Sequence, residues 1–96
     1  MTDASGVSVS RRVTILNGRG LHARAAAKFV KLAGTFDAEI MVARNDVEVS
    51  GSSIMGLMML GAAPGCELEL RASGRHAEAA VEALSGLIAN RFDEEV

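Results

Sequence analysis

The chain has 96 residues, a formal net charge of −2, and 49% hydrophobic and 23% charged residues, as is typical of one folded domain with a single core. Trp and Tyr are absent and Cys66 is the only cysteine, which predicts an aliphatic core and excludes an internal disulfide framework. The longest apolar run, residues 54–60, is too short to span a bilayer, and residues 1–10 lack a signal-peptide core. These features together favour a cytoplasmic protein without a membrane anchor.

Charge is distributed unevenly along the chain. Residues 11–36 contain six basic side chains and no acidic one: Arg11, Arg12, Arg19, Arg24, Lys28 and Lys31. A local positive field on an acidic protein suits a small anion or an acidic protein partner. It supports nucleic-acid binding only weakly, because the aromatic side chains that stack on bases are missing.

The first half of the chain predicts a tail, a strand, a loop and a helix. Residues 1–8 are polar without periodicity, so we expect a mobile N-terminal tail followed by a single domain over residues 9–96. Residues 9–16 show an alternating pattern of side chains and are rich in β-branched residues, as in a strand. A glycine-broken loop at 17–20 leads into residues 21–33, whose apolar positions 26, 29, 30 and 33 predict an amphipathic helix that ends at Gly34.

The second half predicts a hairpin, a short helix, a strand and a long helix. Strands at 37–43 and 47–49 are joined by a turn at 44–46. Residues 50–53 (SGSS) can cap a helix at 54–60, which stops at Gly61 and Pro64. A fourth strand at 66–72 and a final helix at 75–92 follow. The order β-α-β-β-α-β-α predicts an α+β two-layer sandwich, with a four-stranded sheet covered on one face by three helices.

The junction between the loop at 17–20 and the first helix is the main candidate site. This helix lacks a Ser, Thr, Asp or Asn cap and places His22 and Arg24, instead of acidic residues, in its opening turn. Such a helix start is suited to an anion. Arg24 disfavours a charged imidazole, so a neutral ring nitrogen of His22 is available as a nucleophile. We therefore expect phosphoryl transfer onto His22; a histidine that only bonds to the loop is the plainer alternative.

Two further features concern the short helix at 54–60. Ser53 is expected to cap it, and a phosphate there would add negative charge to the neighbouring surface, so Ser53 is also a candidate regulatory position. The helix is apolar almost all round, which indicates either an exposed docking surface with adaptable methionines or burial on both sides.

The remaining reactive side chains carry no predicted chemistry. His76 is expected on the surface and Cys66 is expected to act as a small hydrophobic residue. Their spacing from His22 matches no metal site, and no cofactor is expected.

Two sequence segments resemble one known family. Residues 20–24 (GLHAR) resemble the active-site segment of HPr, the histidine phosphocarrier of the bacterial phosphotransferase system, and residues 53–58 (SIMGLM) resemble its regulatory-serine segment. The likeness covers residues 9–92. It implies an open-faced sandwich with an antiparallel sheet and three helices.

The resemblance also implies roles for individual residues. His22 would accept a phosphoryl group on Nδ1 from phosphorylated enzyme I and pass it to an enzyme IIA protein, with Arg24 neutralising the phosphate. Ser53 would be phosphorylated by HPr kinase/phosphorylase, which weakens transfer from enzyme I. Docking would use Ile54, Met55 and Met58. The protein would be a stoichiometric carrier without turnover of its own, and we expect a monomer.

Two positions depart from the family pattern. Ala25 stands where the family usually has proline, and Ser52 stands where lysine is frequent. The alanine run at 25–27 and the Met-rich helix resemble nitrogen-related or regulatory variants, so either sugar transport or regulation could be the output. The residues themselves leave two alternative functions: a small-molecule regulatory domain of split β-α-β type that binds an anion, and an RNA-binding domain using the basic face of residues 11–31.

Overall fold

The elements follow the predicted order. A computed structural model describes residues 8–94. Its elements are β1 (Ser8–Thr14), α1 (Ala23–Ala33), β2 (Glu39–Arg44), β3 (Val47–Ser50), α2 (Ile54–Met59), β4 (Glu67–Ser73), α3 (Ala77–Ala89) and the short 3₁₀ helix η2 (Arg91–Asp93). Most bounds differ from the predicted ones by one or two residues, which is the usual uncertainty at element ends.

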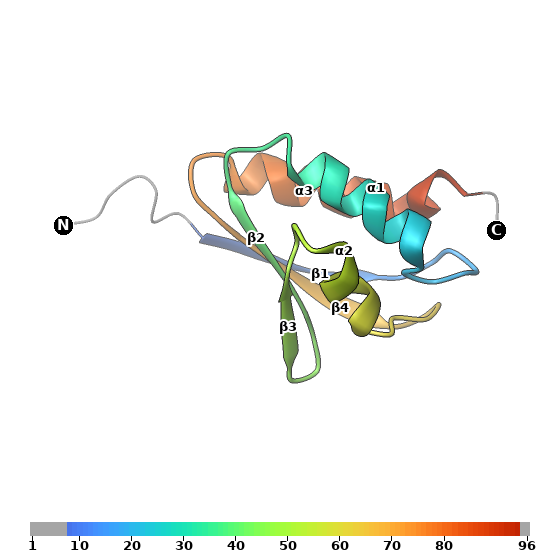
Figure 1. The fold of residues 1–96 in the computed structure, drawn as a ribbon. Helices are drawn as coiled ribbons and strands as arrows, with labels where there is room; N and C mark the ends of the chain where they lie inside the picture. Colours follow the sequence, from blue (N-terminus) through green and yellow to red (C-terminus); the bar gives the residue numbers. More distant parts are fainter. Residues whose placement is uncertain (1–7, 95–96) are drawn as a thin grey trace.

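The four strands form one antiparallel sheet in the order β1-β4-β2-β3. Both central strands are paired along most of their length, with Val13 of β1 opposite Leu68 of β4 and Val42 of β2 opposite Leu70. All three helices lie on one side of the sheet, with α1 beside α3 and α2 beside α1 (Figure 1). The predicted open-faced α+β sandwich is confirmed.

The core lies between the sheet and the helices and is aliphatic, as expected. Alternate residues of β4 point into it, so Leu68, Leu70 and Ala72 are buried whereas Glu67 and Arg71 are exposed. Its remaining buried side chains come chiefly from β2, α1, α2 and α3, and Phe29 and Phe92 are the largest that are fully enclosed.

Ion pairs occupy the open face of the sheet. Arg71 of β4 binds Glu48 on β3 at 2.6 Å and Glu69 at 2.9 Å, and Arg12 of β1 binds Glu67 at 3.2 Å. The hydrogen bonds that Arg71 donates to Glu69 and then to Glu48 raise the pKa of Arg71. This face is therefore polar and solvated, as is usual for one side of an antiparallel sheet.

The predicted final helix at 75–92 is wrong at its C-terminal end. Helix α3 ends at Ala89, and the Asn90 N–H bonds to the carbonyl of Gly86. The next three residues take left-handed backbone angles, with φ of 59° at Arg91, 53° at Phe92 and 63° at Asp93. Phe92 follows Ile88 by four residues and is buried, so hydrophobic spacing could not distinguish this turn from a continuing helix.

The predicted tail at residues 1–8 is also too long by one residue, because Ser8 pairs with Ser73 in β1. Residues 1–7 lie outside the described part of the chain. Within residues 8–94 no helix has the length and apolar character needed to cross a membrane.

Candidate functional site

The loop before α1 is held in place by its own polar groups and by a neighbouring segment. Asn17 is fully buried and donates from Nδ2 to the Gly20 carbonyl at 2.7 Å, while the Gly20 N–H returns a bond to the Asn17 carbonyl at 3.1 Å. Gly20 has φ of +68°, and a Cβ there would lie 2.5 Å from the Ala62 oxygen. Glycine is therefore required, and the Leu21 N–H completes the attachment to Ala62 at 2.9 Å.

His22 is itself the cap of α1, so the prediction that this helix lacks a side-chain cap is wrong. Its backbone is extended, with φ of −80° and ψ of −179°, and its Nδ1 accepts from the Arg24 N–H at 3.3 Å. The His22 carbonyl accepts the first helical bond from Ala26 at 2.8 Å. As predicted, the first turn of α1 carries no acidic residue.

The charge around His22 is not wholly positive, contrary to the sequence expectation. The Glu94 Oε2 atom lies within hydrogen-bond distance of His22 Nε2, and Glu94 Oε1 accepts from Asn17 Nδ2 at 3.1 Å. The side chains of His22 and Glu94 are only 20% and 13% exposed. The bond to His22 lowers the pKa of Glu94, with a further lowering from Asn17 that burial opposes.

Glu94 and Asn17 are the site residues that sequence reasoning missed. Glu94 is 72 positions from His22 in the chain, and it reaches the site only because the turn after α3 brings the C-terminal segment back toward α1. No motif or periodicity signals that contact. Asn17 lay in the recognised loop, but nothing in the sequence indicated that its side chain would be fully buried.

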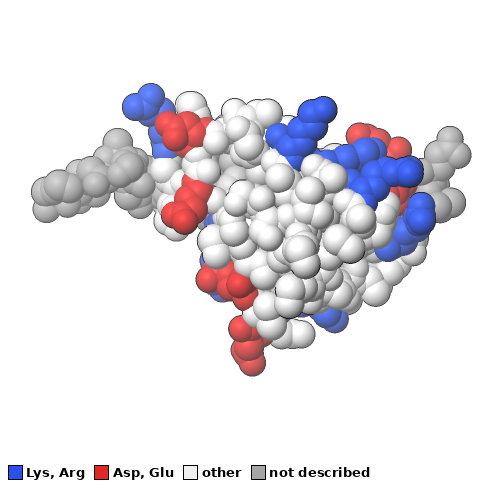
Figure 2. All heavy atoms as spheres, in the orientation of Figure 1, with Lys and Arg blue, Asp and Glu red and all other residues white. Residues whose placement is uncertain are grey.

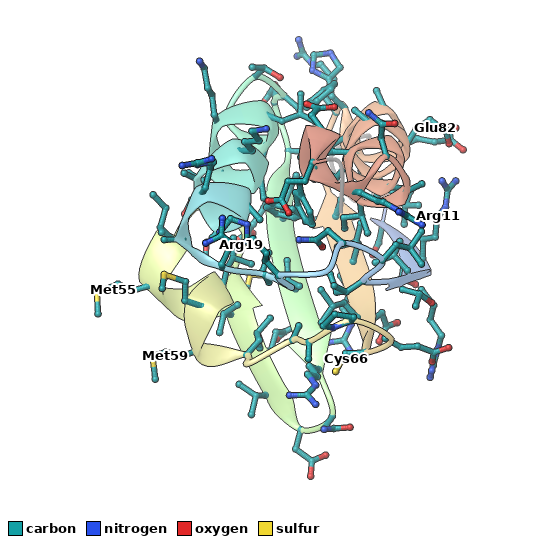
Figure 3. The ribbon with its side chains drawn as sticks, turned by 90° about the vertical axis from the view of Figure 1, so that its right-hand side faces the viewer. Arg11, Arg19, Met55, Met59, Cys66 and Glu82 are labelled. Carbon is teal, nitrogen blue, oxygen red and sulfur yellow. The ribbon has the colours of Figure 1, made fainter. Side chains whose placement is uncertain are left out.

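Arg24 lies on the surface beside His22. Among residues 8–94 no carboxylate is within ion-pair distance of its guanidinium group. Arg19 also lies at this end of α1 (Figure 3), and its charge adds a small lowering to the pKa of Glu94. The site therefore combines a histidine, an accessible cation and the N-terminal backbone of a helix.

The predicted basic face of residues 11–31 is divided by ion pairs. Arg11 binds Glu82 of α3 at 3.0 Å, and Arg12 binds Glu67. Figure 2 shows several positive groups near the start of α1, with others along the upper edge of the molecule, and a broad uncharged surface over α2. A short positive area of this kind is more suitable for a small anion than for a nucleic-acid backbone.

Ser53 caps α2, as predicted. Its Oγ accepts from the Gly56 N–H at 2.9 Å. Ser52 is exposed, and its hydroxyl lies 2.8 Å from that of Ser50. The two adjacent serines therefore differ: one hydroxyl is engaged in the helix start, while the other belongs to the preceding turn.

Helix α2 buries one side and exposes the other. Leu57 and Leu60 are buried, whereas Met55 and Met59 are 74% and 77% exposed and project away from the body of the molecule (Figure 3). Together with the half-exposed Ile54 and Met58 they form what we call the methionine patch (Ile54, Met55, Met58 and Met59). Burial of this helix on both sides is excluded. Helix α2 contacts α1, and Figure 3 shows it beside the end of α1 at which Arg19 lies.

The other reactive side chains lie elsewhere. His76 is exposed at the start of α3 and accepts from the Asp37 N–H at 3.3 Å, as expected for a surface histidine. Cys66 is half-buried before β4. Residues 8–94 contain no group of three His, Cys, Asp or Glu side chains placed to hold a metal ion.

Comparison with known proteins gives the family. The family model described as the PTS HPr component phosphorylation site matches residues 9–90. The chain belongs to the HPr family. It is therefore a phosphocarrier of the phosphotransferase system and not a catalytic enzyme. Membership of this family does not favour the two alternative functions, an anion-binding regulatory domain and an RNA-binding domain.

Individual HPr relatives match over nearly the whole chain. The phosphocarrier protein HPr of Pseudomonas aeruginosa is 51% identical over 83 residues, which cover 85% of this chain and 92% of the relative. The phosphocarrier protein NPr of Shewanella violacea is 43% identical over 86 residues, which cover 90% of this chain and 94% of the relative. A crystal structure of HPr-C-His from Thermoanaerobacter tengcongensis superposes with a TM-score of 0.87 at 41% identity, covering 92% of this chain and 99% of that one.

Proposed function

We propose that His22 accepts and donates the phosphoryl group, and that Nδ1 is the atom that carries it. The observation that supports this most directly is the position of Nδ1 at the start of α1, where it faces the Arg24 N–H. The first N–H groups of a helix have no partner within the helix, and the dipole makes this end attractive to phosphate. A phosphoryl group on Nδ1 would thus be held by the helix that His22 already caps.

Arg24 is proposed to stabilise the phosphoryl oxygens. Its exposed guanidinium group has no carboxylate partner within residues 8–94, so it is available to a phosphate without breaking an ion pair. Arginine forms charge-assisted hydrogen bonds with phosphate, and these are about twice as strong as neutral ones. We propose that phosphorylated enzyme I is the donor and that enzyme IIA proteins are the acceptors.

The methionine patch is proposed as the surface on which these partners dock, with Ile54, Met55 and Met58 as its central contacts. An exposed apolar patch beside a reactive group favours protein association, and flexible thioethers can adapt to several partners. The patch and His22 lie on one chain, so a monomer suffices. Relatives named HPr and NPr both match, and either a sugar-transport or a nitrogen-related output is compatible with this surface.

Ser53 is proposed as a regulatory phosphorylation site for a kinase of the HPr kinase/phosphorylase type. A phosphate at the N-terminus of α2 would be compatible with the helix dipole, and its oxygens could accept from the Gly56 N–H in place of Oγ. It would also place about two negative charges beside the methionine patch. Docking of enzyme I on an apolar surface would then be weakened by desolvation of those charges.

Phosphorylation with purified enzyme I and phosphoenolpyruvate tests the carrier function. We expect the intact mass of the protein to increase by one phosphate that is labile in acid and stable in base, and fragment masses to place it on His22. The variant His22→Ala should accept none, while His76→Ala, which alters the exposed histidine at α3, should behave as wild type. Phosphate on the His22→Ala variant would refute the assignment.

A further inference from the structure

The segment after α3 is held against α1 by several independent contacts. Three successive non-glycine residues, Arg91, Phe92 and Asp93, have positive φ, a conformation that persists only when the surroundings impose it. Phe92 is fully buried, and its carbonyl accepts from Lys28 Nζ of α1 at 2.7 Å. The Glu94 N–H bonds back to the Arg91 carbonyl at 2.9 Å. This C-terminal turn therefore delivers Glu94 to His22 in a defined position.

Both carboxylate oxygens of Glu94 are engaged. One accepts from Asn17 Nδ2, and the other pairs with His22 Nε2. An ionised carboxylate has no proton to donate, and the lowered pKa of Glu94 keeps it ionised at neutral pH. The proton in the contact between Glu94 and His22 consequently resides on Nε2.

The other ring nitrogen of His22 reports the same proton arrangement. Its Nδ1 accepts from the Arg24 N–H and must therefore carry a lone pair. A neutral imidazole has one proton, so Glu94 on one side and the Arg24 amide on the other require the same tautomer. In that tautomer the lone pair lies on the nitrogen at the start of α1.

We propose that Glu94 is a positioning residue that fixes the proton of His22 on Nε2 and thereby presents Nδ1 as the nucleophile. This inference rests on the proposed role of His22 as the phosphoryl carrier. In an imidazole the bond made by one nitrogen sets the protonation of the other, which is the physical basis for such an assignment. Glu94 touches neither donor nor phosphoryl group and acts through the ring.

The transfer step is balanced without further reactants. The Nδ1 lone pair attacks phosphorus and forms the N–P bond, while the bond from phosphorus to the donor breaks and its electron pair stays with the donor. The ring keeps the proton on Nε2 and gains positive charge, which the Glu94 carboxylate compensates at hydrogen-bond distance. Transfer to the acceptor runs in the opposite sense, and the electron pair of the N–P bond returns to Nδ1.

This contact is not part of the sequence pattern that identifies the family. The family model matches residues 9–90, and Glu94 lies beyond them. The fold places it at His22 through the turn at 91–93, the buried Phe92 and the Lys28 bond. The positioning role is therefore a property inferred for this chain from its own tertiary contacts.

An isosteric amide at position 94 gives the sharpest test. In Glu94→Gln, Asn17 Nδ2 would bind the amide oxygen, because Asn17 is buried and also holds Gly20. The amide NH₂ would then face His22 Nε2 as a donor and demand a lone pair there, in conflict with the Arg24 N–H on Nδ1. Glu94→Ala would only remove the acceptor. The amide should thus be more harmful than the truncation.

We would record the ¹⁵N shifts of the His22 ring, in the absence of any phosphoryl donor, and the rate of phosphorylation by enzyme I and phosphoenolpyruvate. Wild type should show the Nε2–H tautomer. Glu94→Gln should shift the ring toward the Nδ1–H tautomer and slow transfer about tenfold relative to wild type. Glu94→Ala should slow it only about threefold relative to wild type, because the wrong tautomer impairs a histidine more than the loss of a hydrogen-bond acceptor does. Glu78→Gln makes the same change from carboxylate to amide at an exposed position in the first turn of α3, away from the C-terminal turn, and should leave both readouts unchanged.

The results separate the two proposals. A wild-type tautomer in Glu94→Gln, or transfer as fast as in Glu94→Ala, would overturn the positioning role. Failure of the wild-type protein to accept phosphate would overturn the carrier assignment instead, while the ring tautomer would still report whether Glu94 controls His22.

Discussion

The starts of α1 and α2 make an instructive pair, because the atoms that cap these two helices are the two proposed phosphorylation sites. His22 Nδ1 accepts from the Arg24 N–H at 3.3 Å, which is long for such a bond, whereas Ser53 Oγ accepts from the Gly56 N–H at 2.9 Å, an ordinary length. Phosphorylation of Nδ1, which removes this lone pair, should therefore destabilise α1 only slightly. The hydroxyl of Ser53 contributes more to its helix.

The surroundings of the two caps differ even more. His22 lies beside the exposed Arg24, so added negative charge meets a compensating cation, while the Glu94 carboxylate at Nε2 compensates the positive charge that the ring gains. Ser53 borders the methionine patch, whose exposed side chains are apolar. Although both sites lie at a helix N-terminus, His22 is therefore suited to carrying a phosphoryl group and Ser53 to controlling the docking of partners.

Removing the nucleophile while keeping a cap should give the largest effect. In His22→Asn the amide oxygen can cap α1, because asparagine is among the preferred N-cap residues. We expect no phosphate uptake from enzyme I and phosphoenolpyruvate, with a free energy of unfolding within about 1 kcal/mol of wild type. Intact mass spectrometry and urea denaturation measure the two quantities. Retained uptake would show that the acceptor is another residue.

Removing the cation beside His22 should give the next largest effect. Arg24→Ala should slow phosphoryl transfer about 100-fold, as is typical when one charged or hydrogen-bonding group that stabilises a transition state is lost. Stability should hardly change because the side chain is exposed. Stopped-flow transfer kinetics and thermal melting would separate the two. A markedly lower melting temperature would instead indicate that Arg24 has a structural role.

Adding charge at the second cap should act on docking. Ser53→Asp keeps a capping side chain but places a carboxylate beside the methionine patch, and we expect the rate of transfer from enzyme I to fall about tenfold. The neighbouring variant Ser52→Asp adds the same charge outside the helix cap and should have a weaker effect. Equal rates for wild type and Ser53→Asp would argue against regulation through this surface.

Loss of the Ser53 cap should affect stability but not transfer. Ser53→Ala removes the acceptor for the Gly56 N–H and should lower the free energy of unfolding by about 1 kcal/mol. Urea denaturation measures this loss, and transfer kinetics should match wild type because no charge is added. Slower transfer in this variant would mean that α2 must be well formed for docking.

The smallest effect concerns pH and the C-terminal turn. The pKa of Glu94 is lowered below its ordinary 4.5 by the bond to His22, so the unfolded chain binds more protons in this range. The stabilisation by Glu94 should thus be present above about pH 4.5 and decline as pH falls through the folded pKa. Denaturation of wild type and Glu94→Ala across pH 3–6 should show their difference in stability shrinking toward low pH. A constant difference would place the effect of Glu94 elsewhere.

Much of the fold could be read from local patterns. Strand alternation, helical spacing and the serines before residue 54 predicted the element order, the sheet with helices on one face and the Ser53 cap, because these depend on neighbouring residues. The end of α3 could not be read in the same way. Phe92 satisfies helical spacing after Ile88 and also fills the core from a left-handed turn, so only packing decides between the two.

The candidate site shows the same division. The sequence by itself determined the family, the histidine at a helix start, the arginine beside it and an apolar helix with too little core to cover it, since each is a feature of contiguous residues. Only the tertiary structure decided that His22 caps its own helix through Nδ1 and that Glu94 occupies Nε2. The Nδ1 contact is local but depends on the rotamer of His22, whereas the Glu94 contact depends on a turn that returns the chain across 72 positions and leaves no trace in local spacing.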